Sequence, residues 1–201
     1  ACSGFSQFEG YIRQINLPNT SVNLIIHGHN FFIDGMSLRQ IFKISDTSTV
    51  TIQFVTLQNG FAGNTTNGGG AIESRAVLTV KKVIFNNNHS LLNGGAMAIL
   101  GSGAVPMSIS DSTFSNNGSG GSGGAISQGG GTLTIKRTKF TDNTATSRGG
   151  AISSNEKLII ETATFSGNST GAEGGAIFKD NRQPLFLKLS ALLNNVAGTK
   201  G

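Results

Sequence analysis

Short stretches with apolar residues at every second position recur along the chain. Each has one central residue flanked by two apolar ones: Leu78-Thr79-Val80, Met107-Ser108-Ile109, Leu133-Thr134-Ile135, Leu158-Ile159-Ile160 and Leu185-Phe186-Leu187. This spacing predicts a β-strand with two side chains on its inward face. The five stretches therefore predict equivalent short strands in successive segments of the chain.

Two further motifs recur at the same intervals as these strands. A Gly-Gly-Ala motif precedes each strand, with its Ala at Ala71, Ala96, Ala125, Ala151 and Ala176. These Ala positions step by 25, 29, 26 and 25 residues. A Phe-x-x-Asn motif follows the first four strands, and Leu192 to Asn195 keeps its spacing after the fifth. A fixed period of about 20–50 residues indicates a repeat architecture.

Each repeat offers three short strands, which centre on the Ala-Ile pair, the apolar stretch and the Phe. Repeats stacked at the strand spacing of about 4.8 Å can pair every strand with its equivalent. We therefore predict an all-β fold, a right-handed parallel β-helix of about seven or eight coils with three short parallel sheets. A single β-helix domain is expected over residues 1–201, with irregular N-terminal coils over 1–49, regular coils over 50–195 and no clear cap over 196–201.

Stacked repeats bring the Phe and the Asn of the second motif into two internal rows. Phe rings in register fill a narrow core, and Asn side chains can hydrogen-bond to one another from coil to coil. Asn also tolerates the left-handed conformation, so the ladder Asn is expected at the turn itself. The predicted ladder residues are Phe85, Phe114, Phe140, Phe165, Asn88, Asn117, Asn143, Asn168 and Asn195.

Glycosylation signals overlap with the predicted Asn ladder. Asn-x-Ser/Thr sequences begin at Asn19, Asn64, Asn88, Asn117 and Asn168. The last three are ladder residues, and a buried amide cannot carry a sugar. We therefore predict glycosylation only at Asn19 and Asn64, which lie in loop-like sequence.

Together the Gly-Gly-Ala-Ile and Phe-x-x-Asn motifs resemble the repeats of the chlamydial polymorphic outer membrane proteins, over about residues 50–195. More broadly, they are similar to surface proteins with a pectin-lyase-like β-helix. In the chlamydial family, the repeats form the passenger of an autotransporter, which is exposed on the cell surface and implicated in adhesion. The resemblance therefore implies a surface-exposed, adhesive β-helix.

Composition restricts the partners of such a protein. Only 12% of the 201 residues are charged, about half the usual share. The net charge is +5, but the basic pairs Lys81-Lys82 and Lys136-Arg137 are scattered and lack interleaved aromatic residues, so nucleic acid is not expected as a partner. No stretch reaches the roughly 20 apolar residues that span a bilayer. For Cys2, the one cysteine, lipidation, cross-linking to another chain and no role all stay open.

Enzymes with this fold offer an alternative function. Polysaccharide lyases and uronate epimerases need carboxylates gathered on one face, near a Lys, Arg or His. Asp111 and Glu161 follow the core strands of their coils, and Arg137 follows that of the coil between them. We interpret this alternation as a solvated face of paired charges, so no catalytic residue is expected.

His27 and His29 form the only histidine cluster. They could bind a metal if a third ligand such as Asp34 joined them, but a strand end followed by a turn is the simpler interpretation. No metal-binding or cofactor-binding residue, and no cofactor, is therefore expected.

These patterns predict an extracellular or cell-surface structural and adhesive protein. Its expected partners are a protein or glycan on a host or neighbouring cell, and further copies of the chain joined head to tail into filaments. A carbohydrate-active enzyme is the first alternative. An ice-binding surface is the second, because Thr51, Thr79, Ser108 and Thr134 form a regular outward row that Ile159 and Phe186 interrupt.

Overall fold

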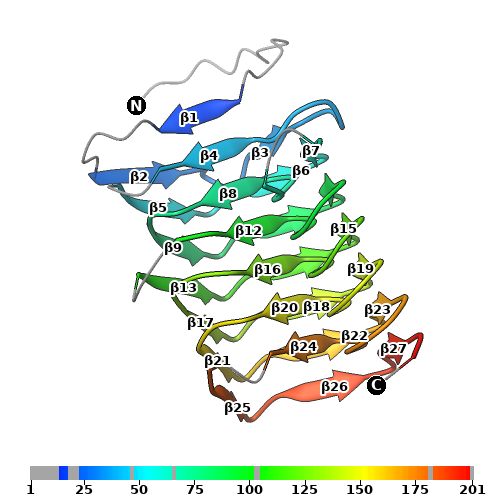
Figure 1. Ribbon diagram of the computed structural model, residues 1–201. Helices are drawn as coiled ribbons and strands as arrows, with labels where there is room; N and C mark the ends of the chain where they lie inside the picture. The colour runs from blue at the N-terminus through cyan, green and yellow to red at the C-terminus, as the bar shows by residue number, and fades with distance from the viewer. Residues whose placement is uncertain are drawn as a thin grey trace.

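The computed structural model describes residues 14–17, 23–45, 48–64, 67–101, 105–180 and 183–199. Its regular structure consists of 27 short β-strands, and the described residues form no helix. The strands wind into a stack of parallel turns, with β1 and β27 at opposite ends (Figure 1). The predicted all-β parallel solenoid is therefore confirmed.

Four parallel sheets run along the stack. They are numbered in the order in which their first strands occur in the chain. The first contains β1 (Ile15–Leu17), β4 (Phe42–Ile44), β8 (Ile72–Ser74), β12 (Met97–Ile99), β16 (Ile126–Gln128), β20 (Ile152–Ser154) and β24 (Ile177–Lys179). The second contains β2 (Asn23–His27), β5 (Thr49–Gln53), β9 (Val77–Lys81), β13 (Pro106–Ser110), β17 (Thr132–Lys136), β21 (Leu158–Glu161) and β25 (Leu185–Lys188). The third contains β3 (Phe32–Asp34), β6 (Thr56–Gln58), β10 (Ile84–Asn86), β14 (Thr113–Ser115), β18 (Lys139–Thr141), β22 (Thr164–Ser166) and β26 (Ala191–Leu193). The fourth contains β7 (Phe61–Ala62), β11 (His89–Ser90), β15 (Gly118–Ser119), β19 (Thr144–Ala145), β23 (Ser169–Thr170) and β27 (Val196–Ala197).

The prediction of three sheets was wrong, because it missed the fourth. Strands of that sheet have only two residues and one inward side chain, such as Ser119 or Ala145, so they leave no alternating apolar pattern. The stack has six complete turns of four strands, preceded by a turn in which three strands are described. The described part of 1–49 stacks in the same register, since β2 pairs with β5 over five residues.

A single row of phenylalanine rings forms the centre of the core. Phe85, Phe114, Phe140 and Phe165 occupy equivalent positions of the third sheet and are fully buried. Their ring centroids lie 4.4, 4.9 and 4.7 Å apart, with interplanar angles of 10° or less. Leu57 precedes this row in register. Identical rings therefore stack from turn to turn at close to the strand spacing.

The Gly-Gly-Ala motif makes the corner that leads into the first sheet. Its first glycine is left-handed, as at Gly123 with φ of +72°, where a side chain is strained. Its second glycine lies against the next turn, so that a Cβ atom on Gly124 would lie 2.0 Å from the carbonyl oxygen of Gly150. Both glycines are therefore required, one by backbone conformation and the other by contact between turns.

An asparagine ladder runs beside the phenylalanine row. The Nδ2 atoms of Asn88, Asn117, Asn143 and Asn168 donate to Oδ1 of the ladder Asn in the next turn, at 2.8–3.0 Å. Each of these Oδ1 acceptors, the last being Asn195, also accepts from the backbone N–H of the preceding ladder Asn at 3.0–3.1 Å. Each Nδ2 donates in addition to the carbonyl of the Phe or Leu one turn earlier, at 3.0–3.1 Å. The buried amides are thus fully hydrogen-bonded.

The left-handed residue of the turn directly precedes the ladder Asn. The sequence pattern had instead predicted the left-handed conformation at the ladder Asn itself. Asn87, Asn116 and Asp142 have φ of 54°, 55° and 53°, whereas no ladder Asn has a positive φ. The ladder amide is therefore selected by its hydrogen bonds between turns. The preceding residue supplies the bend.

Replacing Asn143 by Ala should destabilise the protein strongly. The change removes the acceptor for two donors of Asn117 and the donor to the Phe114 carbonyl, all of them buried. We expect the free energy of unfolding to fall by about 3 kcal/mol or more, measured by chemical denaturation. The exposed Asn155 is the matched control, and Asn155→Ala should change stability by less than about 0.5 kcal/mol. Equal effects of the two substitutions would contradict this role for the ladder.

Candidate functional site

The outer face of the second sheet is the most regular surface of the protein. Its central column consists of the residues in register at the middle of each strand: Ile25, Thr51, Thr79, Ser108, Thr134, Ile159 and Phe186. We call this column the lateral face. Ser108 Oγ donates to Thr79 Oγ1 at 3.3 Å, so neighbouring hydroxyls are linked along it. Apolar Ile25 and Phe186, which are 65% and 53% exposed, end the column.

A charged corner lies beside the lateral face, where the chain passes from the second sheet to the third. We call it the basic edge and define it as residues 81–82, 110–111, 136–139, 161–162 and 188–189. From the second turn of the stack onward, this corner has one left-handed residue in each turn: Phe54, Lys82, Asp111, Arg137, Thr162 and Leu189. Their backbone N–H groups donate to the next turn where one follows, as Arg137 does to the Glu161 carbonyl at 3.0 Å. These bonds hold the strained conformation, so the corner accepts many residue types.

Ion pairs link successive turns of the basic edge. The Arg137 guanidinium donates to both carboxylate oxygens of Asp111, at 2.6 and 2.9 Å. Lys136 Nζ lies 3.0 Å from Glu161 Oε2 in the next turn. Hydrogen bonds from Arg137 hold the pKa of Asp111 below its ordinary value, and the charge of Lys81 also lowers it. Burial raises this pKa by a smaller amount. The prediction that these charges pair is confirmed.

The register of Glu161 differs from the prediction. Sequence spacing treated Asp111, Arg137 and Glu161 as equivalent, but Glu161 pairs with Lys136, and the left-handed corner position of its turn is Thr162. Glu161 is the last residue of β21, one position before the corner. Each of the two carboxylates is therefore held by its own cation.

The basic edge concentrates the positive charge of the protein. It contains Lys81, Lys82, Lys136, Arg137, Lys139 and Lys188, which are six of the twelve described Lys and Arg residues. It contains only two of the eight described Asp and Glu residues, Asp111 and Glu161. The edge thus carries a net charge of +4, and the rest of the described surface is balanced. The sequence prediction of scattered cations missed this gathering, although both basic pairs occupy the same phase of the repeat.

A buried carboxylate on the first sheet has a structural role. Glu73 on β8 accepts from Arg75 Nη1 at 2.8 Å, and from Asn67 through its backbone N–H at 3.3 Å and its side-chain amide at 3.2 Å. Burial by itself raises the pKa of Glu73, but these hydrogen bonds and the charge of Lys43 outweigh it and hold the pKa below its ordinary value. Glu73 therefore fixes the segment that enters the first Gly-Gly-Ala corner.

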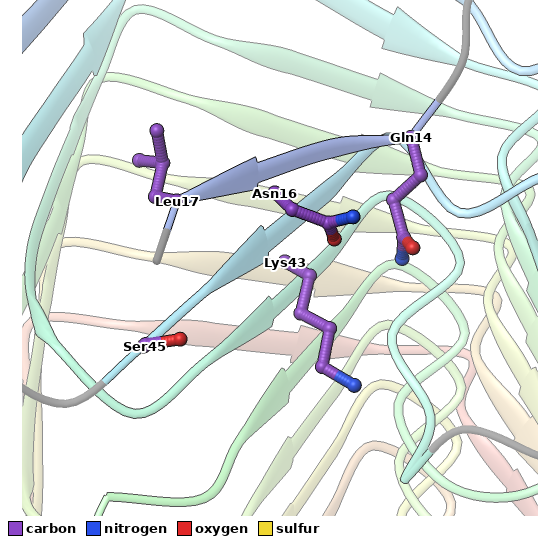
Figure 2. Close-up of a pocket in the computed structure, with 5 residues that line it drawn as sticks. All are labelled: Gln14, Asn16, Leu17, Lys43 and Ser45. Carbon is purple, nitrogen blue, oxygen red and sulfur yellow. The ribbon is translucent and has the colours of Figure 1, made fainter. Parts of the chain in front are cut away.

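Two surface pockets offer little chemistry. In Figure 2, Gln14, Asn16 and Lys43 project from one side of β1 and β4, and Leu17 points the other way. Lys43 is the only charged residue lining this pocket, and its Nζ lies 3.8 Å from Glu73 Oε1. The second pocket is lined by Ser122, Thr146, Ser147, Arg148, Ala172, Glu173 and Thr199. Its one cation, Arg148, lies 3.3 Å from Glu173 and over the ring of Phe178.

The histidine cluster forms a stacked turn. The His27 ring stacks on Phe54 at 4.7 Å and contacts the His29 ring at 4.3 Å. Asp34 accepts hydrogen bonds from Gln58, Asn59 and the backbone of Met36. Among the described residues, no three His, Cys, Asp or Glu side chains gather closely enough to hold a metal ion.

The sequon asparagines differ sharply in exposure. Asn88, Asn117 and Asn168 are buried in the ladder, whereas Asn64 is exposed in a turn after β7. Asn19 and Cys2 lie outside the described residues. Within those residues, no helix is long and apolar enough to cross a membrane.

Three segments of the chain match the family model of the Chlamydia polymorphic membrane protein repeat: residues 111–129, 137–155 and 162–179. Each begins at the corner after the second sheet and ends at, or one residue after, the end of the first-sheet strand of the next turn. The resemblance seen in the motifs is thus confirmed for these repeats, and it suggests a surface or outer-membrane protein family. No curated protein and no solved structure matches the chain significantly.

Replacing Glu73 by Gln should lower stability in a pH-dependent way. Because folding lowers the pKa of Glu73, its ionised form stabilises the protein above the ordinary glutamate pKa, and this contribution is lost as pH falls through the folded-state pKa. We expect a loss of about 1–3 kcal/mol at pH 7 that shrinks as pH falls below the ordinary glutamate pKa, measured by chemical denaturation across pH. Glu156→Gln, at a carboxylate without an ion pair within the described residues, is the control and should change stability at pH 7 by less than about 0.5 kcal/mol. A Glu73→Gln deficit that is the same at pH 7 and pH 3 would contradict the assignment.

Proposed function

We propose that this chain is a non-catalytic, adhesive segment of a cell-surface protein, which binds its partner through the lateral face and the basic edge. The lateral face carries the proposal, because its residues lie in register and repeat similar side chains at the strand spacing along one side of the stack. Such a surface suits many weak contacts that act together. The match to a surface-protein repeat supports an extracellular setting.

The carboxylates favour binding over catalysis. Asp111 and Glu161 are each committed to a cation, and Glu73 is buried among its hydrogen-bond donors. A glycosidase or lyase needs carboxylates that face a substrate groove. These three carboxylates are therefore not free to serve the polysaccharide-active alternative.

Adhesion can be tested with beads that carry the purified chain. We expect coated beads to bind cultured epithelial cells well above albumin-coated beads. The variant Thr79→Glu/Thr134→Glu, which charges the lateral face in two turns, should reduce binding at least 5-fold. His89→Glu/Thr144→Glu places the same charges on the outer face of the fourth sheet and should leave binding unchanged. Wild-type binding no higher than albumin would overturn adhesion, and equal loss in both variants would overturn the assignment to this face.

A second candidate function, head-to-tail assembly, is favoured by the exposed C-terminal turn. Leu185, Leu187 and Leu192 are 37%, 43% and 48% exposed, although their partners in the preceding turn are fully buried. Ile26 and Ile33 occupy the corresponding inward positions of the first turn and are only partly buried. The N-terminal turn of a second copy would continue the same apolar rows and pair with the strands of the last turn.

This assembly predicts rods of varied length in electron micrographs of the purified chain. The double substitution Leu187→Glu/Leu192→Glu should convert them to monomers in sedimentation velocity, because it charges the stacking end. Leu189 is 78% exposed at the corner and outside the apolar rows, so Leu189→Glu should leave the rods intact. Uniform monomers of the wild type at high concentration would contradict assembly.

A further inference from the structure

We propose that the basic edge binds a linear acidic polysaccharide whose chain runs along the axis of the stack. This proposal rests on the adhesive function proposed above and names the chemistry of its partner. The edge holds the whole net positive charge of the described residues, although it is one corner of a four-sided stack. A localised excess of positive charge attracts polyanions and accelerates their association.

The spacing of the cations defines the kind of polyanion that fits. Lys81 and Lys82 lie in one turn, Lys136, Arg137 and Lys139 two turns later, and Lys188 two turns beyond. Cationic turns therefore recur about every 10 Å along the axis, given a strand spacing near 4.8 Å. This interval is comparable to the length of one disaccharide unit. A polysaccharide with an anionic group in each disaccharide can thus meet a cationic turn at every repeat.

The turns between the cations favour a polysaccharide over a nucleic acid. Asp111 and Glu161 occupy these intervening turns, where they pair with Arg137 and Lys136 and no free cation among the described residues faces the ligand. A nucleic acid strand carries one phosphate per about 3.4 Å, so phosphates would lie opposite both carboxylates. A polysaccharide with one carboxylate in each disaccharide, such as hyaluronan, has its charges farther apart and can place neutral sugar atoms there.

Several cations of the edge remain available to a ligand. Arg137 and Lys136 are engaged with Asp111 and Glu161. By contrast, Lys81, Lys139 and Lys188 are exposed, and none of them has an ion pair within the described residues. The side chains that remain available thus come from three turns, so that a ligand longer than one disaccharide gains a further contact with each cationic turn it covers.

The edge continues into an aromatic surface at its N-terminal side. Phe54 occupies the corner position one turn before Lys82, and the Lys82 ammonium lies 5.0 Å from its ring centroid. The exposed His27 ring also stacks on the Phe54 ring, so that Lys82 and His27 cover it. A ligand at this end of the edge therefore meets the Lys82 ammonium and the exposed His27 ring.

The binding test uses hyaluronan as the probe with one carboxylate per disaccharide, heparin as a densely charged comparison, and neutral dextran and duplex DNA of similar length. We expect the chain to bind hyaluronan in 0.15 M salt and more weakly as salt rises. The double variant Lys81→Ala/Lys139→Ala should lose at least 10-fold in affinity. Arg39→Ala/Lys157→Ala removes two exposed cations away from the edge and should lose less than 2-fold.

Several outcomes would overturn the proposal. They are no binding to hyaluronan, equal binding to dextran, tighter binding to DNA than to hyaluronan, and equal loss in the two variants. Cell binding separates the proposal from the function on which it rests. Bead adhesion that soluble hyaluronan and enzymatic removal of acidic glycans leave unchanged would overturn the polysaccharide but keep adhesion. Absence of bead adhesion would overturn the adhesive function itself.

Discussion

The structure depends on one constraint: each turn must lie directly over the previous one at the spacing of paired β-strands. At that spacing, equivalent side chains are in contact, so an interior row is stable only if its residue type packs against itself. Flat phenylalanine rings can do so, and Phe85 and Phe114 stack with ring centroids 4.4 Å apart. Glycine is required where backbones meet, because a Cβ atom on Gly124 would lie 2.0 Å from the carbonyl oxygen of Gly150. The repeat in the sequence is the direct result of this self-contact.

The same constraint explains how a polar row can lie inside an apolar core. An Asn amide has two donors and can accept two hydrogen bonds, and a stack offers the same partners at every level. Asn143, for example, donates to Asn168 and to the Phe114 carbonyl, and accepts from both donors of Asn117. Because every member is satisfied, the ladder resists a slip of one turn against the next. Asn therefore recurs along this row because of its hydrogen bonds between turns more than because it forms the turn.

The sequence was informative where the constraint selects one residue type and less informative elsewhere. Gly, Phe and Asn recur because their positions admit few alternatives, so the parallel stack could be predicted from them. The fourth sheet could not, because two-residue strands with one inward side chain, such as Ser119, leave no periodic signal. The corner after the second sheet accepts residues as different as Asp111 and Thr162, since a backbone hydrogen bond to the next turn holds its left-handed conformation. The position of this corner within the repeat, and hence the gathering of cations there, became visible only in the structure.

This freedom at the corner determines where function can reside. Interior rows are fixed by packing, whereas outer columns and the corner can change without loss of the fold. Small ligands are usually held in a concave pocket that buries most of their surface. The cations that line the two surface pockets are instead already paired, Lys43 with Glu73 and Arg148 with Glu173. A stack of this kind gains affinity by repeating modest contacts along its length, and the partner best matched to it is one whose own chemistry repeats.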